Sequence, residues 1–294
     1  MESPPPAPFL DPSRLLDSSR PLPRISLTWW AGAGFIVVVL VTLLIGNKTA
    51  RAQELVSVIW AGATLVLMGA LFGFSFYTVK RFRSDQQRVE RIGELVQLRR
   101  WPEAAVAVDQ YLTSPARTHG FRAQALVYLS SVLARLHRFE DAIAVHNQLL
   151  EEGTLDEGSA ATVRLARAMA MLREDHLFDA DRAINELRRG PLAGSAGLAL
   201  VEIYRDVKTG HPAEATELFE QKREVLRDQL GHRVADAYAL AARAYDLLGR
   251  EAEARSAFQS ATLLAPVAEL LRRYPEVEKL TGRYPLAAAP PEAA

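Results

Sequence analysis

Two long apolar runs near the N-terminus constrain the fold more than any other feature of this sequence. Residues 27–45 and 55–79 contain no charged residue, and they are 19 and 25 residues long. About 20 apolar residues in a helix are enough to cross the hydrocarbon core of a bilayer. A soluble helix of this length carries a polar face, which both runs lack. The runs therefore predict a transmembrane helical hairpin, residues 27–79, whose two helices are joined by the short external loop 46–54.

Aromatic and basic residues flank the two predicted spans in the way that is typical of membrane proteins. Tryptophans open the first run, and a tyrosine and several basic residues follow near the end of the second. The predicted membrane-interface residues are Trp29, Trp30, Tyr77, Lys80, Arg81 and Arg83. Lys and Arg are more frequent around the hairpin than in its loop, which places both chain ends in the cytoplasm. This predicts an integral protein of a bacterial inner membrane.

A cleaved signal peptide is the alternative interpretation of the first run. Ala50-Arg51-Ala52 has the small-x-small form of a cleavage site and follows the apolar stretch. The run starts at Leu27, however, and is longer than the apolar core of a signal peptide. Cleavage after Ala52 stays open at this point, and it would leave the second span in place.

The charge balance and the absence of cysteine exclude several classes of function. The chain has 35 Lys and Arg against 35 Asp and Glu, so that its formal net charge is +0. Proteins that bind nucleic acid carry a basic excess, and nucleic acid is therefore not an expected partner. The count of cysteines is zero, which excludes disulfides, thiolate metal sites and a cysteine nucleophile.

An acidic residue followed by alanine recurs along the rest of the chain. The spacings between successive copies are 38, 38, 35 and 39 residues. Apolar residues follow the alanine at helical spacing, and a second apolar helix and a short turn precede each copy. This pattern predicts about five helix–turn–helix units. The copies are Glu103-Ala104, Asp141-Ala142, Asp179-Ala180, Glu214-Ala215 and Glu253-Ala254.

These units resemble the tetratricopeptide (TPR) repeat family, whose period is about 34 residues and whose pattern ends in Ala, Phe and Pro. The fifth unit carries the closest match, with Gly249, Ala254, Phe258, Ala261 and Pro266 in the family's order. The resemblance covers roughly residues 85–266. It implies an all-α fold in which the two membrane helices precede a TPR-like α-solenoid.

The resemblance also implies where a partner binds. TPR proteins bind peptides and protein segments in a groove lined by the first helix of each unit. The groove positions of the second and fifth units are Gln124, Val127, Ser131, Ala239, Arg243 and Asp246. They are chemically mixed, and the Lys/Asn-rich set with which some members grip carboxyl termini is absent.

The ends of the chain and the segment after the hairpin complete the domain organisation. Residues 1–26 are rich in proline and predict a disordered cytoplasmic tail, and residues 282–294 predict a second disordered tail. Residues 80–100 are a basic juxtamembrane start of the solenoid, for which contact with anionic lipid headgroups is expected. The repeat domain is expected over residues 85–281, including a C-terminal capping helix at Val267–Arg273.

No arrangement of residues predicts a catalytic, metal or cofactor site. None of the six histidines forms a helical metal-ligand pair, and at helical spacing each is expected to be a surface or packing residue. Ser195 lies in a sequence close to a nucleophile elbow but lacks the preceding strand that this motif requires. Lys208-Thr-Gly210 has no accompanying Ser-x-x-Lys motif. We therefore expect a protein that is not an enzyme and that has no small-molecule substrate.

Two functional hypotheses follow. The first is a membrane-anchored TPR-like adaptor or scaffold that binds protein partners at the cytoplasmic face of the membrane. The second is an accessory subunit of a membrane enzyme or transport complex, which contacts that complex through its transmembrane helices.

Overall fold

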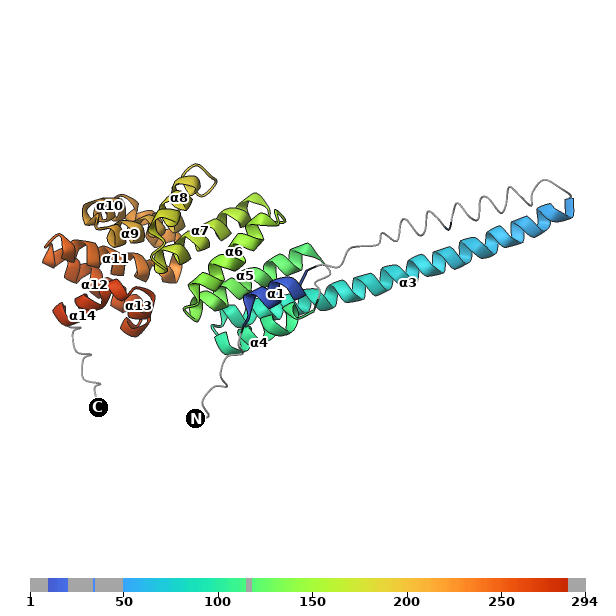
Figure 1. The fold of residues 1–294 in the computed structure, drawn as a ribbon, viewed down its shortest axis with the longest axis horizontal. Helices are drawn as coiled ribbons and strands as arrows, with labels where there is room; N and C mark the ends of the chain where they lie inside the picture. The colour runs from blue at the N-terminus through green and yellow to red at the C-terminus, as the bar shows by residue number, and fades with distance from the viewer. Residues whose placement is uncertain (1–9, 21–33, 35–49, 115–117, 285–294) are drawn as a thin grey trace, which may run out of the picture. The chain divides into compact units, whose positions relative to one another are not determined.

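The computed structural model describes residues 10–20, 34, 50–114 and 118–284 (Figure 1). Within these residues the chain is helical and contains no strand. It divides into two compact units, Met1–Tyr128 and Leu129–Ala294, with the division inside one helix. The all-α part of the predicted fold class is therefore confirmed for the described chain.

The helices are short, apart from one near the N-terminus, and are joined by tight turns. The first unit contains α1 (Pro12–Ser18), α3 (Ala50–Gln97), α4 (Trp101–Leu112) and the first part of α5 (His119–Arg135). The second unit contains the end of α5 followed by α6 (Phe139–Glu151), α7 (Glu157–Arg173), α8 (Leu177–Leu187), α9 (Ala196–Thr209), α10 (Pro212–Gln229), η1 (Gly231–Arg233), α11 (Val234–Leu247), α12 (Glu251–Leu264), α13 (Val267–Arg273), η2 (Pro275–Val277) and α14 (Glu278–Arg283).

The predicted transmembrane hairpin is wrong for the part of the chain that the structure describes. No helix within these ranges is both long enough and apolar enough to cross a bilayer. Residues 55–79 are helical, but they form the first part of α3, which continues without a break into the charged stretch up to Gln97. The prediction treated the apolar run as a separate element, whereas the structure makes it one portion of a longer helix of mixed polarity.

This finding also overturns the predicted integral membrane localisation. Most of the first predicted span, with Trp29 and Trp30, lies outside the described residues. Tyr77, Lys80, Arg81 and Arg83 lie exposed on α3, where the Arg81 guanidinium is 4.3 Å from the centre of the Tyr77 ring. The expected contact of residues 80–100 with lipid headgroups stays a prediction from the sequence.

Part of the N-terminal stretch is folded, although its composition predicts a tail. Asp11 caps α1, and Pro12 occupies the first turn of the helix, a position where proline is well tolerated. Leu10 and Leu15 are fully buried, with 0% and 1% of their surface exposed. The Ser18 hydroxyl donates a 2.7 Å hydrogen bond to the Leu112 carbonyl of α4. Residues 10–20 therefore belong to the packed first unit.

The same turn joins the two helices of each hairpin along the described chain. One residue of each turn adopts a left-handed conformation with φ between 57° and 79°, and the next amide donates to the carbonyl five residues earlier at 2.8–2.9 Å. This is the Schellman arrangement that ends a helix. The left-handed residues are Arg99, His137, Asp175, Gly210 and Gly249. Their spacings repeat those of the acidic-Ala pairs, so the units predicted from the sequence are repeated helical hairpins.

The register predicted for the second helix of each hairpin is confirmed. The alanine of every acidic-Ala pair is completely buried, with 0% of its surface exposed, and each acidic residue lies in the first turn of its helix. A methyl group at this position lets the two helices approach closely. The buried alanines are Ala104, Ala142, Ala180, Ala215 and Ala254.

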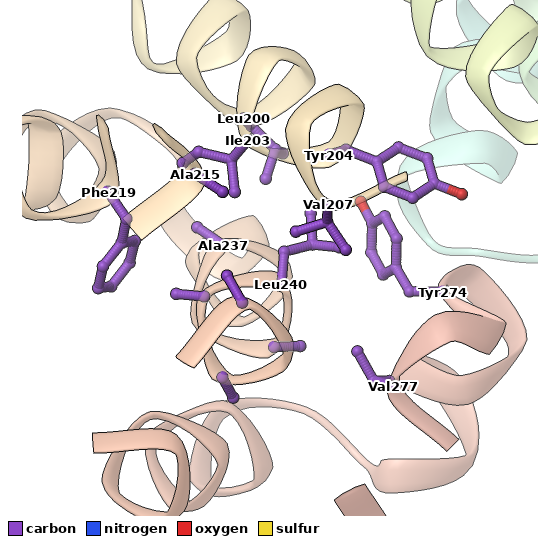
Figure 2. Close-up of a cluster of buried hydrophobic side chains, with 14 of the residues drawn as sticks. Leu200, Ile203, Tyr204, Val207, Ala215, Phe219, Ala237, Leu240, Tyr274 and Val277 are labelled. Atoms are coloured by element: carbon purple, nitrogen blue, oxygen red, sulfur yellow. The ribbon is translucent and has the colours of Figure 1, made fainter. Parts of the chain in front are cut away.

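The core of the second unit lies between successive first helices. Figure 2 shows Leu200 and Ile203 of α9 pointing toward α11, where Ala237 and Leu240 are fully buried. Helices α7, α9 and α11 contact one another in this order, while α8, α10 and α12 contact their own first helices. This alternation is compatible with an α-solenoid.

The C-terminal segment Val267–Tyr284 forms part of this core. The predicted capping helix Val267–Arg273 is observed as α13, and the fold continues through η2 and α14 to Tyr284, beyond the expected boundary at 281. Tyr274 is completely buried and its ring meets that of Tyr204 edge-on, with 5.1 Å between ring centres (Figure 2). Residues 285–294 of the predicted tail lie outside the described chain.

Candidate functional site

We call the surface carried by Leu129–Arg135 of α5 and by α7, α9 and α11 the first-helix face. It carries the helices on which the sequence predicts partner binding. In the second unit, the C-terminal segment of the same chain covers one part of this face. Another part contains a cavity.

The C-terminal segment covers the face at α9 and α11 through buried polar contacts. Arg273 is 2.5 Å from the carboxylate of Asp236, which is itself fully buried, and the Tyr274 hydroxyl donates to the same carboxylate at 3.3 Å. The Tyr204 hydroxyl donates to Glu276 at 3.1 Å. Burial, followed by the charge of Glu276, raises the pKa of Tyr204, so this phenol stays protonated.

Three of the six predicted groove residues lie on α11, and the same segment contacts one of them, Asp246. Ala239 is completely buried in the core. Arg243 and Asp246 form an ion pair at 2.8 Å. Asp246 also accepts hydrogen bonds from Arg283 at 2.8 Å and from the Tyr284 hydroxyl at 3.1 Å. These positions are therefore on the predicted helix but do not form an open groove.

The other three predicted groove residues lie on α5, in both units. Gln124 is exposed and lines a hollow of the first unit together with Phe121 and Tyr128 of the same helix. Val127 is partly buried. Ser131 lines a cavity of the second unit. The structure thus brings Ser131 to the candidate site and places Gln124 elsewhere.

The cavity of the second unit has a volume of about 250 Å³ and lies on the first-helix face. Helices α5, α6, α7 and α9 and the short helix η1 all contribute to its lining. Its apolar wall includes Ala134, Phe139, Leu165, Met169 and Val201. Its polar wall consists of Ser130, Ser131, His146, Thr162, Arg173 and Arg233.

Helical spacing explains why these side chains meet. Phe139 and His146 are seven residues apart and therefore share one face of α6. On α7 the lining residues recur at intervals of three and four from Thr162 to Arg173. Gly197 lets α9 approach α7, because a Cβ at this position would lie 2.7 Å from the Cδ2 atom of Leu165. The cavity is thus framed by the regular packing of successive hairpins.

His146 is the unusual residue of this cavity. Only 4% of its surface is exposed, and its Nδ1 atom has no hydrogen-bond partner in the described chain. Burial, with a smaller contribution from the Arg167 charge, lowers its pKa from 6.5 to about 4. The imidazole is therefore buried and neutral at pH 7, and its Nδ1 atom lacks a hydrogen-bond partner among the described residues.

The repeat itself marks His146 as an exception. The residue four positions after the buried alanine is apolar in every other hairpin, as Val108, Ile184, Phe219 and Phe258. These residues are buried, with at most 3% of their surface exposed. A polar residue in their place costs stability unless it is satisfied. The sequence contains this signal, although helical spacing alone predicts only a surface or packing residue at each histidine.

Arginines give the cavity a positive character. The Nε atom of Arg173 is buried without a hydrogen-bond partner among the described residues, and the guanidinium lies 5.2 Å from the centre of the Phe139 ring. Arg233 also lines the cavity and is 3.5 Å from Asp236. No aspartate or glutamate of the described ranges belongs to the lining. After burial, the charges of Arg272, Arg173 and Arg135 further lower the pKa of the nearby His137.

The residues considered for catalysis have structural roles. Ser195 caps α9, where its hydroxyl accepts a 3.3 Å hydrogen bond from the Leu198 amide. The ammonium of Lys208 donates to the Leu172 carbonyl at 2.7 Å and pairs with Asp175 at 2.5 Å. Within the described parts of the chain, no group of three or more His, Cys, Asp or Glu residues is placed to hold a metal ion.

Comparisons of the chain with protein-family models, with curated proteins and with solved structures found no match.

Proposed function

We propose that this chain is a non-catalytic, TPR-like adaptor that binds a segment of a partner protein in the cavity of its second unit. The observation that carries the proposal is a partly polar cavity on the first-helix face, lined by a buried histidine that lacks a partner. Concave sites with an apolar lining and a few polar groups are typical of ligand-binding sites. The Ser195 hydroxyl caps α9 and the Lys208 ammonium pairs with Asp175, so both groups already have structural partners.

The part of the first-helix face that the C-terminal segment covers is excluded as a binding site. The C-terminal segment covers α9 and α11 with side chains that are almost fully buried, among them Leu270, Tyr274 and Leu280. Removing each of them from the core would cost about 1.5–3 kcal/mol. The cavity around α7 is left as the part of the face where a partner has access. The alternative of an accessory subunit relied on the predicted membrane spans and is not part of this proposal.

A cavity-filling variant tests the proposal. Ala166 lines the cavity on α7 and is exposed, so Ala166→Trp should fill the space without removing a packing contact. Ala144 on α6 is also an exposed helical alanine but does not line the cavity, and Ala144→Trp is the matched control.

Binders would be selected from a library of random 12-residue peptides against the full chain. Their Kd values would then be measured by fluorescence polarisation. We expect Ala166→Trp to raise Kd at least tenfold and Ala144→Trp to leave it unchanged. A selection without binders, or binders that tolerate Ala166→Trp, would contradict the proposed function.

A further inference from the structure

The polar groups of the cavity define the chemistry of the partner, and this inference rests on the proposed function. We propose that the cavity binds an acidic side chain of the partner segment, an aspartate or glutamate flanked by an apolar residue, with Arg173 and His146 as its hydrogen-bond donors.

The first argument is a pair of buried nitrogen atoms without hydrogen-bond partners. The Nε–H of Arg173 and the Nδ1 atom of His146 are both buried and both lack a partner in the described chain. Buried polar groups in folded proteins are nearly always hydrogen-bonded, so each unsatisfied group calls for an explanation. A carboxylate can accept from the Arg173 Nε–H, and also from His146 in the tautomer that carries its proton on Nδ1, because its two oxygens together offer about four acceptor positions.

The second argument is charge. Arg173 and Arg233 line the cavity, and among the residues that the structure describes no carboxylate does. Arginine binds carboxylates with particular geometric specificity, because its planar guanidinium presents several N–H groups in a fixed fork. The cavity therefore favours an anion and disfavours a basic side chain.

The third argument is the apolar wall. Leu165, Met169 and Val201 line the cavity together with Phe139, against which Arg173 stacks. A free inorganic anion would leave this apolar surface in water. An acidic residue with an apolar neighbour would contact both the polar and the apolar wall. Burial of its apolar surface would then add to the binding free energy of the charge-assisted hydrogen bond.

The position of the donors favours a side chain over a terminal carboxylate. Arg173 lies on α7, and helices on both sides of α7 in the packing order, α6 and α9, also line the cavity. The partner segment can therefore continue past the acidic residue in both directions across the face.

A double-mutant cycle tests the proposal. The probes are peptides from the library selection, synthesised with an amidated C-terminus, and the same peptides with their acidic residue changed from Glu to Gln. The proteins are the full chain and its Arg173→Gln variant. In the wild-type protein, the change in the peptide should raise Kd at least tenfold. In Arg173→Gln the same change should raise Kd less than twofold, because the partner charge is already gone.

Further variants separate a binding role from a structural one. Arg173→Lys keeps the positive charge but lacks the Nε–H donor, and we expect intermediate affinity. His146→Leu removes the second donor and should weaken the acidic peptide more than its Gln analogue. Arg182→Gln, at an exposed position on α8, is the control and should leave Kd unchanged. Helical content and the melting temperature of each variant would be measured alongside.

Three results would overturn the inference. The first is that the selected peptides share no acidic position. The second is that the Glu-to-Gln change raises Kd equally in wild type and in Arg173→Gln. The third is that binding requires a free C-terminal carboxylate on the peptide. If such peptides still lose affinity with Ala166→Trp, the acidic-residue inference fails while the proposed function stands. If the peptides bind Ala166→Trp with the same Kd as the wild-type protein, the proposed function itself is contradicted.

Discussion

Replacing His146 with leucine should remove a large part of the acid sensitivity of this protein. In the folded chain, burial and Arg167 lower the pKa of this imidazole from 6.5 to about 4. Above pH 6.5 the imidazole is neutral in both the folded and the unfolded state, so protonation does not affect stability. As the pH falls below 6.5 the unfolded chain takes up a proton that the folded chain does not bind, and the free energy of unfolding decreases.

The structure sets the size of this effect. A pKa difference of one unit corresponds to about 1.4 kcal/mol, so wild-type protein should lose about 2 kcal/mol through His146 between pH 7.5 and 5, and about 3 kcal/mol by pH 4. His146→Leu lacks this component. At pH 7.5 the two proteins should differ by less than about 1.5 kcal/mol, because leucine fits an apolar environment of similar volume.

Urea unfolding followed by circular dichroism at pH 7.5, 6, 5 and 4.5 measures the effect. Other groups also titrate over this range, and they contribute equally to both proteins, so the difference between the two curves isolates His146. Replacement of His232, an exposed histidine of η1, provides the control. Parallel stability curves for wild type and His146→Leu would refute the reasoning.

Three further predictions concern the fold. His137→Gly should raise the free energy of unfolding by about 0.5–1 kcal/mol in a urea titration, because glycine adopts the left-handed conformation of this turn without strain; an unchanged or lower value would contradict this. Ala254→Glu should lower the free energy of unfolding by several kcal/mol, since it places a charge in a fully buried helix contact, whereas Ala252→Glu on the exposed face should change it by less than about 0.5 kcal/mol. Equal melting temperatures for these two variants would show that the register is wrong. Tyr274→Ala should cost about 3–5 kcal/mol, because it empties a completely buried site and leaves Asp236 without one of its hydrogen-bond donors; a cost below 1 kcal/mol would show that the C-terminal segment is not part of the core.

The parts of the fold that could be predicted are those that local periodicity determines. The acidic-Ala pairs located the second helix of each hairpin, and the burial of Ala104 and Ala254 follows directly from that register. The membrane helices were not predicted correctly, because the hydropathy of residues 55–79 does not show that α3 continues into the charged residues beyond them. Helix α1 was missed because proline enrichment outweighed the capping signal of Asp11 followed by Pro12.

The candidate site depends on contacts between distant parts of the chain, which the sequence does not reveal. Asp246 was placed in an open groove, but Tyr284, 38 residues further along, covers it. His146 occupies a position that is apolar in the other hairpins, a signal that the sequence contains but that our prediction of a surface or packing histidine did not use. Its unpartnered Nδ1 atom and the nearby Arg173 became visible only when α6 and α7 were packed together.

Site-specific photo-crosslinking tests most directly whether the cavity of the second unit binds a protein segment. A diazirine analogue of leucine, which is much smaller than tryptophan and leaves most of the cavity open, would replace Ala166 in one protein and Ala144 in the other, and each would be irradiated with the same selected peptide. We predict adducts at position 166 that disappear when excess unlabelled peptide is present, and none above background at position 144. Adducts of equal yield at both positions, or adducts only at position 144, would contradict the account.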